Sequence, residues 1–187
     1  MIKNKNIVLG IIGCGTIGKF HVRNIVQNFR SVKIKSICDT DIENVKNWAV
    51  KEGFSDGITF TSDYKDILSD DQINAVVIAT QITQHTDILI SAANAGKNIF
   101  CEKQIGVHPE KVKTAIDIAK KQNLKLQVGF HRRFDINYIK AREMILNNAV
   151  GDIHVVKAVS RLPEVLAARY LQKGLFAGHF NEVTSHD

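Results

Sequence analysis

The sequence predicts a doubly wound α/β fold with a parallel sheet, followed by an incomplete second α/β domain. Two observations support this prediction: short apolar, β-branched segments alternate with longer amphipathic ones, and the alternation stops after residue 130. Such alternation is typical of βαβ units, in which helices cover both faces of a parallel sheet. We therefore expect one complete domain over residues 1–130 and the beginning of a second over residues 131–187.

The expected strands are short runs of apolar and β-branched residues, at 7–12, 32–38, 58–60, 75–79, 98–101 and 125–130. The expected helices have apolar residues at helical spacing, at 16–29, 41–52, 84–95 and 109–122. In the last of these, Pro109 suits the first helical turn. Beyond residue 130 we expect a polar helix over 136–148 and an extended segment over 153–161, with poor periodicity after it.

The composition describes an ordinary globular protein, with 44% hydrophobic and 24% charged residues. The net charge of +6 comes from scattered basic residues without an aromatic-interleaved cluster, so we expect no nucleic-acid partner. No apolar run reaches the length of a membrane span, and we expect a cytoplasmic protein. Cys14, Cys38 and Cys101 form no CxxC pair, which favours buried apolar thiols over a disulfide framework or a metal site.

The segment Gly13-Cys14-Gly15-Thr16-Ile17-Gly18 has the pattern GxGxxG between an expected strand and an expected helix. This is the context that a Rossmann dinucleotide site requires. Gly13 permits a tight turn, Gly15 lets a pyrophosphate approach the backbone, and Gly18 lets the helix pack closely on the sheet. The N–H groups at the helix start, including those of Thr16 and Ile17, then bind the phosphates.

An acidic residue at the end of the next strand is the second requirement of such a site. Asp39 ends the second expected strand, 21 positions after Gly18. Its carboxylate would accept hydrogen bonds from the adenosine ribose hydroxyls and repel a 2′-phosphate, which favours NAD over NADP as the cofactor. The alternative is that Asp39 only caps the helix expected near Asp41.

Further motifs follow in order along the chain: Ala75-Val76-Val77-Ile78-Ala79-Thr80, His85, Ala95-Gly96-Lys97-Asn98-Ile99-Phe100-Cys101-Glu102-Lys103, Val128-Gly129-Phe130-His131-Arg132-Arg133-Phe134-Asp135 and Gly151-Asp152-Ile153. Together they resemble the Gfo/Idh/MocA oxidoreductases over nearly the whole chain. Within that family the chain is most similar to the inositol 2-dehydrogenases, partly through Val159-Ser160-Arg161-Leu162-Pro163-Glu164.

The resemblance implies hydride transfer between a nicotinamide and a secondary alcohol or ketone of a cyclitol or sugar. It places Thr80, Glu102 and Lys103 at the cofactor, and it makes Lys103 a catalytic residue that polarises the substrate oxygen or relays its proton. Spacing alone favours a surface lysine after a strand at this position, and the flanking motif match reverses that preference.

The family's second-domain motif maps onto Glu182 and His186, where the histidine would take the alcohol proton. A polar chain end is the alternative for this pair. Arg132 and Arg133 would fix the substrate or the domain interface, or act as ion-pair partners. A homo-oligomer formed through the second domain is a further expectation.

Three residues depart from the family pattern: Gln81 and Gln104 stand where proline is usual, and Glu182 where the inositol enzymes typically have aspartate. Most of the family's second sheet is also missing. We therefore expect a chain that binds NAD but turns over substrate poorly, and that associates through exposed apolar residues at 155, 156, 171 and 175. The alternatives are a non-catalytic dinucleotide-binding protein and an inactive truncated relic.

Overall fold

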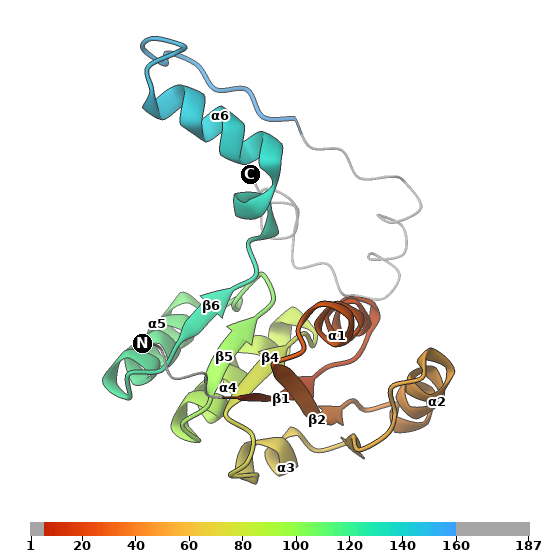
Figure 1. Cartoon of the computed structure of the whole chain (residues 1–187). Helices are drawn as coiled ribbons and strands as arrows, with labels where there is room; N and C mark the ends of the chain where they lie inside the picture. Colours follow the sequence, from red (N-terminus) through yellow and green to blue (C-terminus); the bar gives the residue numbers. More distant parts are fainter. Residues whose placement is uncertain (1–5, 160–187) are drawn as a thin grey trace. The chain divides into compact units, whose positions relative to one another are not determined.

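The computed structural model of this chain describes residues 6–159. It contains a parallel sheet of six strands in the order β3-β2-β1-β4-β5-β6, flanked by helices (Figure 1). This is the strand order of a doubly wound Rossmann sheet, and it confirms the predicted fold class. The chain divides into an N-terminal unit, Met1–Val128, and a C-terminal unit, Gly129–Asp187.

The strands follow the apolar segments of the sequence closely. They are β1 (Ile7–Ile12), β2 (Val32–Cys38), β3 (Thr59–Thr61), β4 (Ala75–Ile78), β5 (Asn98–Cys101) and β6 (Leu126–Val128). Strand β1 lies at the centre and pairs in parallel with β2 on one side and β4 on the other, with Ile12 opposite both Cys38 and Ile78. The end of β1 therefore lies beside the ends of both neighbouring strands.

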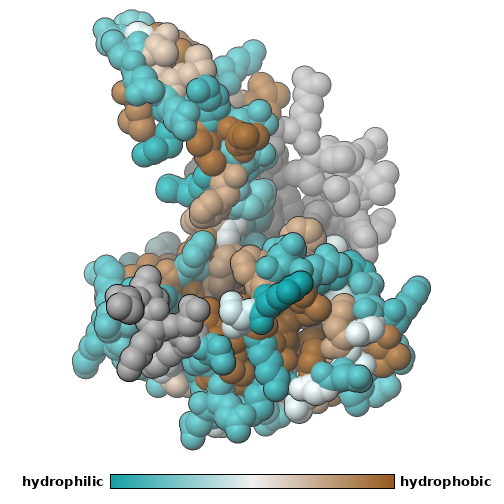
Figure 2. Space-filling model, in the orientation of Figure 1, coloured by the Kyte–Doolittle hydropathy of each residue, from teal (hydrophilic) through white to brown (hydrophobic). Residues whose placement is uncertain are grey.

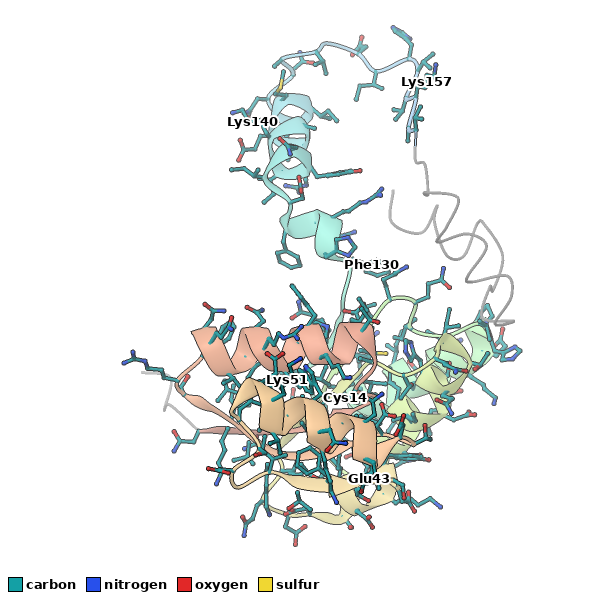
Figure 3. The ribbon with its side chains drawn as sticks, turned by 90° about the vertical axis from the view of Figure 1, so that its right-hand side faces the viewer. Cys14, Glu43, Lys51, Phe130, Lys140 and Lys157 are labelled. Carbon is teal, nitrogen blue, oxygen red and sulfur yellow. The ribbon has the colours of Figure 1, made fainter. Side chains whose placement is uncertain are left out.

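The helices of the N-terminal unit are α1 (Thr16–Asn28), α2 (Ile42–Glu52), α3 (Tyr64–Ser69), α4 (Ile82–Asn94) and α5 (Pro109–Lys121). Helix α2 shows why they begin and end where they do. Asp41 accepts a hydrogen bond from the Asn44 N–H, and Gly53 ends the helix in the left-handed conformation. Glu43 in the first turn and Lys51 in the last complement the helix dipole (Figure 3).

The core lies in two layers, one on each face of the sheet. One cluster includes Ile67 of α3, Leu89 of α4 and Ala115 of α5, and the other includes Val22 of α1 and Val45 of α2. Burial on both faces explains why the central strands read as nearly continuous apolar runs. Side chains of β1 alternate between the layers, with Ile11 in one cluster and Ile12 in the other.

Two sequence expectations differ from the structure. Helix α3 was not expected, because six residues give fewer than two helical turns and too short a pattern to read. The extended segment expected over 153–161 pairs with no strand within its described part, residues 153–159. The other elements agree with the expected ranges to within a few residues.

The described part of the C-terminal unit is a short 3₁₀ helix, His131–Phe134, and helix α6 (Ile136–Leu146). Asp135 caps α6 by accepting hydrogen bonds from Asn137 N–H and Tyr138 N–H. None of the α6 side chains is buried, and hydrophobic surface is visible on this unit (Figure 2). Val155 and Val156, two of the residues expected to drive association, are 84% and 79% exposed. No helix within residues 6–159 is long and apolar enough to cross a membrane.

The three cysteines are buried free thiols at or beside strand ends, as expected. Burial raises the pKa of each thiol, at Cys14, Cys38 and Cys101, from 9.0 to about 12. The carboxylate of Asp39 adds to the rise at Cys14 and Cys38, and that of Glu102 adds to it at Cys101. Each thiol therefore stays protonated at neutral pH.

We predict that thiol reagents label the native protein very slowly. A pKa raised from 9.0 to about 12 lowers the thiolate fraction at pH 8 by about a thousandfold. The measurement is labelling at pH 8 followed by mass spectrometry, with the urea-unfolded chain as control. Because the unfolded thiols lose their protons near pH 9 and the folded ones near pH 12, the free energy of unfolding should also fall as pH rises through that window. Equal labelling rates for native and unfolded protein would contradict the prediction.

Candidate functional site

The expected cofactor-binding residues of the N-terminal unit lie together at one edge of the sheet. The glycine-rich loop follows β1, Asp39 follows β2, Thr80 follows β4, and Glu102 and Lys103 follow β5. Because all the strands are parallel and β2, β1, β4 and β5 are neighbours, their carboxyl ends share this edge. The chain passes from β1 to α1 on one face of the sheet and from β4 to α4 on the other (Figure 1). Ligands of doubly wound sheets bind at such a reversal, beyond the carboxyl ends of the strands.

Backbone hydrogen bonds continue from the sheet into the first residues of these loops. The Gly13 N–H donates to the Cys38 carbonyl at 2.9 Å, and the Ala79 N–H donates to the Ile12 carbonyl at 2.8 Å. The Glu102 N–H donates to the Ile78 carbonyl, also at 2.8 Å. The four loops therefore start from fixed positions relative to one another.

Each glycine of the GxGxxG motif has a separate geometric reason. Gly13 has a φ of +89°, and a Cβ there would lie 2.7 Å from the backbone of Ala79 and Thr80. A Cβ on Gly18 would lie 2.1 Å from the Gly13 carbonyl oxygen, so only glycine lets α1 start this close to the loop. A Cβ on Gly15 would have no heavy atom of residues 6–159 within 4 Å. Gly15 therefore faces open space, as the approach of a pyrophosphate requires.

The start of α1 is suited to bind an anion. The first N–H groups of a helix have no partner within the helix, and Gly15, its N-cap, has no side chain to accept from them. The first turn holds no acidic residue, and Lys19 follows it directly. The positive end of the helix dipole is thus available to phosphates beside the open face of Gly15. These residues fit a dinucleotide pyrophosphate.

Asp39 links the ends of β1 and β2. One carboxylate oxygen accepts from the Cys14 N–H at 2.7 Å, and the other accepts from the Asp41 N–H at 3.0 Å. The carboxylate therefore fixes the glycine-rich loop rather than capping α2, a role that the structure gives to Asp41. Each oxygen can accept more than one hydrogen bond, so the half-buried Asp39 can still bind ribose hydroxyls.

Glu102 has a partner that the sequence reasoning missed. Its Oε1 lies 2.7 Å from Nε2 of His21 on α1, and its Oε2 accepts from the Lys103 N–H at 3.1 Å. The His21 ring also packs edge-on against Phe100, with 5.2 Å between the ring centroids. His21 follows Gly18 by one helical turn, so helical spacing was the available signal that it faces the sheet.

Lys103 is half-buried at the carboxyl edge, directly after Glu102. The peptide bond that joins it to Gln104 is cis. The Gln104 carbonyl oxygen lies 2.6 Å from Nδ1 of His85, whose Nε2 lies 3.0 Å from the Thr80 carbonyl oxygen. His85 appeared in the sequence only as part of a motif, without a role. The structure places it between the segments after β4 and β5.

The remaining expected site residues belong to the C-terminal unit. Glu182 and His186, expected to complete the catalytic set with Lys103, fall outside the described residues. Arg132 and Arg133 belong to the 3₁₀ helix of the C-terminal unit, where the Arg132 guanidinium lies 5.6 Å from the centre of the Tyr138 ring. The roles of these four residues in substrate binding or catalysis stay predictions.

Comparison with known proteins identifies the family. The model of the Gfo/Idh/MocA family, described as an oxidoreductase family with an NAD-binding Rossmann fold, matches residues 7–130. The chain belongs to this family. The match covers the whole sheet and the glycine-rich loop, and it confirms the membership and the NAD-binding Rossmann domain predicted from the motifs.

Several relatives of this family member are inositol dehydrogenases. The chain is 37% identical over 183 residues to an uncharacterized oxidoreductase, YrbE, of Bacillus subtilis, covering 98% of this chain and 52% of that protein. It is 29% identical over 179 residues to the myo-inositol 2-dehydrogenase of Thermotoga maritima, which covers 96% of this chain and 52% of that enzyme. The structure of scyllo-inositol dehydrogenase from Lactobacillus casei with bound NAD(H) and scyllo-inositol matches with a TM-score of 0.87 at 30% identity. The match covers 98% of this chain and 54% of that structure's chain. The chain thus spans about half the length of these relatives.

We predict that alanine lowers stability at one glycine of the loop and NADH affinity at another. Gly18→Ala should destabilise the fold, because its Cβ would overlap the Gly13 carbonyl oxygen. Gly15→Ala should leave the melting temperature nearly unchanged but weaken NADH binding by tenfold or more, because its Cβ fills the open space at the start of α1. Thermal unfolding and NADH fluorescence titration measure the two effects. A Gly15→Ala variant that binds NADH normally would show that the cofactor does not approach this face.

We predict that Asp39→Ala weakens NADH binding by about tenfold or more, since it removes a charged acceptor both from the ribose and from the Cys14 N–H. The loss should be smaller for NADPH, because the carboxylate that repels its 2′-phosphate is also removed. Parallel fluorescence titrations with the two nucleotides measure this. Glu43→Gln, which removes an exposed acid of α2, is the matched charge control and should change neither affinity. An unchanged ratio of the two affinities in Asp39→Ala would contradict the assignment.

Proposed function

We propose that this chain provides the dinucleotide-binding part of an NAD-dependent dehydrogenase that interconverts a secondary alcohol and a ketone on a cyclitol or sugar. The observation that carries the proposal is the placement of Lys103 at the same sheet edge as the open face of Gly15 and the Asp39 carboxylate. A cation beside a dinucleotide site is suited to act on the oxygen of a substrate. The named inositol dehydrogenases among the relatives support the substrate class.

The chemistry divides between the cofactor and the chain's residues. NAD⁺, when bound, accepts a hydride from the alcohol carbon. The N–H groups at the start of α1 bind the pyrophosphate, and Asp39 binds the adenosine ribose and disfavours a 2′-phosphate. Lys103 stabilises the negative charge that develops on the substrate oxygen as the hydroxyl proton leaves, or relays that proton. Gly15 and Asp39 thereby orient the dinucleotide relative to Lys103.

Glu182 and His186 complete this proposal. A histidine can accept the alcohol proton near neutral pH, and an acid four residues before it on a helix would share its face and orient it. Their assignment depends on the family motif in the sequence. A polyol or sugar is thus the proposed partner, and the C-terminal unit is the proposed place of both substrate binding and self-association.

The second candidate is a dinucleotide-binding protein without turnover. Gln81 and Gln104 favour it, because they stand beside the expected reaction site where proline is usual in the family. Both candidates share the cofactor site. They differ in whether Lys103 takes part in a reaction.

We predict that Lys103→Met lowers the rate at which the full chain oxidises inositols with NAD⁺ by a hundredfold or more, the usual contribution of a proton-transferring side chain. Methionine keeps most of the lysine's length and removes its charge. The measurement is NADH formation at 340 nm with a panel of inositols and sugars. The control is the same substitution at an exposed lysine, Lys111→Met, which should leave the rate unchanged. Lys97 does not serve as a control, because it is buried and donates to two backbone carbonyls. NADH binding without turnover of any polyol would favour the second candidate.

A further inference from the structure

The segment that carries Lys103 is held on both sides by histidines. Glu102, before it, contacts His21 of α1, and Gln104, after it, contacts His85 of α4. His21 is partly exposed, whereas the His85 residue is only 2% exposed. Both ring nitrogens of His85 face backbone carbonyl oxygens, so this buried ring carries two polar contacts at once.

The geometry of His85 makes it a bridge between two loops. Its Nδ1 lies 2.6 Å from the Gln104 carbonyl oxygen and its Nε2 lies 3.0 Å from the Thr80 carbonyl oxygen. Carbonyl oxygens only accept hydrogen bonds, so each contact is satisfied when the facing nitrogen donates. A neutral ring satisfies one of them at a time, and a ring with two N–H groups satisfies both. Burial keeps bulk water from replacing either bond.

The two carbonyls belong to segments that the sheet itself no longer joins. Strands β4 and β5 pair in register through Ile78 and Cys101, and the last ladder bond runs from Glu102 N–H to the Ile78 carbonyl. Beyond it, the chain turns at Thr80 toward α4 and continues from β5 through Lys103 to Gln104. The His85 ring spans this separation, where the backbone of one segment no longer bonds to that of the other.

We propose that His85 is a positioning residue that sets the distance between the Thr80 turn, on the cofactor side, and the Lys103–Gln104 segment. The inference rests on the proposed function for the role of Lys103. The buried ring acts through the two carbonyls. Holding the Gln104 carbonyl limits where the Lys103 amine can lie, and holding the Thr80 carbonyl fixes the turn after β4 at the same edge of the sheet.

The two contacts can be separated by substitution. The amide nitrogen of asparagine reaches about as far as a histidine Nδ1, and that of glutamine about as far as Nε2. His85→Asn should therefore keep the bond to Gln104 and lose the bond to Thr80, and His85→Gln should do the reverse. His85→Phe keeps the ring volume and loses both. Thr86→Val is the matched control, because Thr86 is the next buried residue of α4 and donates to the neighbouring carbonyl, that of Ile105, at 3.4 Å.

The experiment uses the full chain with two readouts that need no turnover. The first is the ¹³C NMR signal of the Lys103 amine after reductive ¹³C-methylation, assigned by comparison with Lys103→Arg. The second is the dissociation constant for NADH. We expect His85→Gln to shift the Lys103 signal with NADH affinity retained, and His85→Asn to keep that signal and weaken NADH binding about fivefold, the worth of one hydrogen bond. Thr86→Val should change neither.

The outcomes separate this inference from the proposed function. If the Lys103 signal and the NADH affinity match wild type in both His85→Asn and His85→Gln, or if Thr86→Val moves them equally, the positioning role is wrong. If His85→Phe folds, as checked by circular dichroism, it should show both the shifted Lys103 signal and the weaker NADH binding. If it does not fold, His85→Asn and His85→Gln still test the positioning role. A Lys103 signal that responds to His85→Gln in a chain whose turnover is unaffected by Lys103→Met would retain the positioning role and reject the proposed reaction.

Discussion

The central position of β1 is the constraint on which the rest of the structure depends. Because β1 pairs with β2 on one side and β4 on the other, the loops that follow these three strands begin side by side. The helices that continue from β1 and β4 lie on opposite faces of the sheet, so the two loops must diverge. Where the chain diverges in this way, the first N–H groups of the following helix have no partner within the helix and can bind a ligand. The strand order and the helix connections therefore place these N–H groups, and the side chains only add to the site.

The sequence predicted those parts of the molecule that depend on local pattern. Strands buried on both faces are apolar throughout, and the helices between them have apolar residues at helical spacing, so both could be read directly. The glycine-rich loop and Asp39 could be predicted because their spacing along the chain is set by one strand-helix-strand unit. Helix α3 was too short to leave a pattern.

The histidine contacts could not be predicted in the same way. The pairing of His21 with Glu102 joins residues 81 positions apart, and it exists because α1 packs near the end of β5. His85 meets Gln104 because β4 and β5 are neighbours, a fact of sheet order rather than of periodicity. Helix α6 could be predicted only in part. Its start was readable from the sequence, because Asp135 is a typical capping residue. Which side of the helix packs against other residues could not be predicted, since none of its side chains is buried among the described residues.

The bond between Asp39 and the Cys14 N–H has a kinetic consequence. It forms within the protein alone, so the glycine-rich loop takes its shape during folding rather than when a ligand arrives. The conformational entropy of that loop is then lost during folding and not during association with a ligand. A loop that is already ordered loses less conformational entropy on association, so differences in affinity between nucleotides should arise mainly in their rates of release.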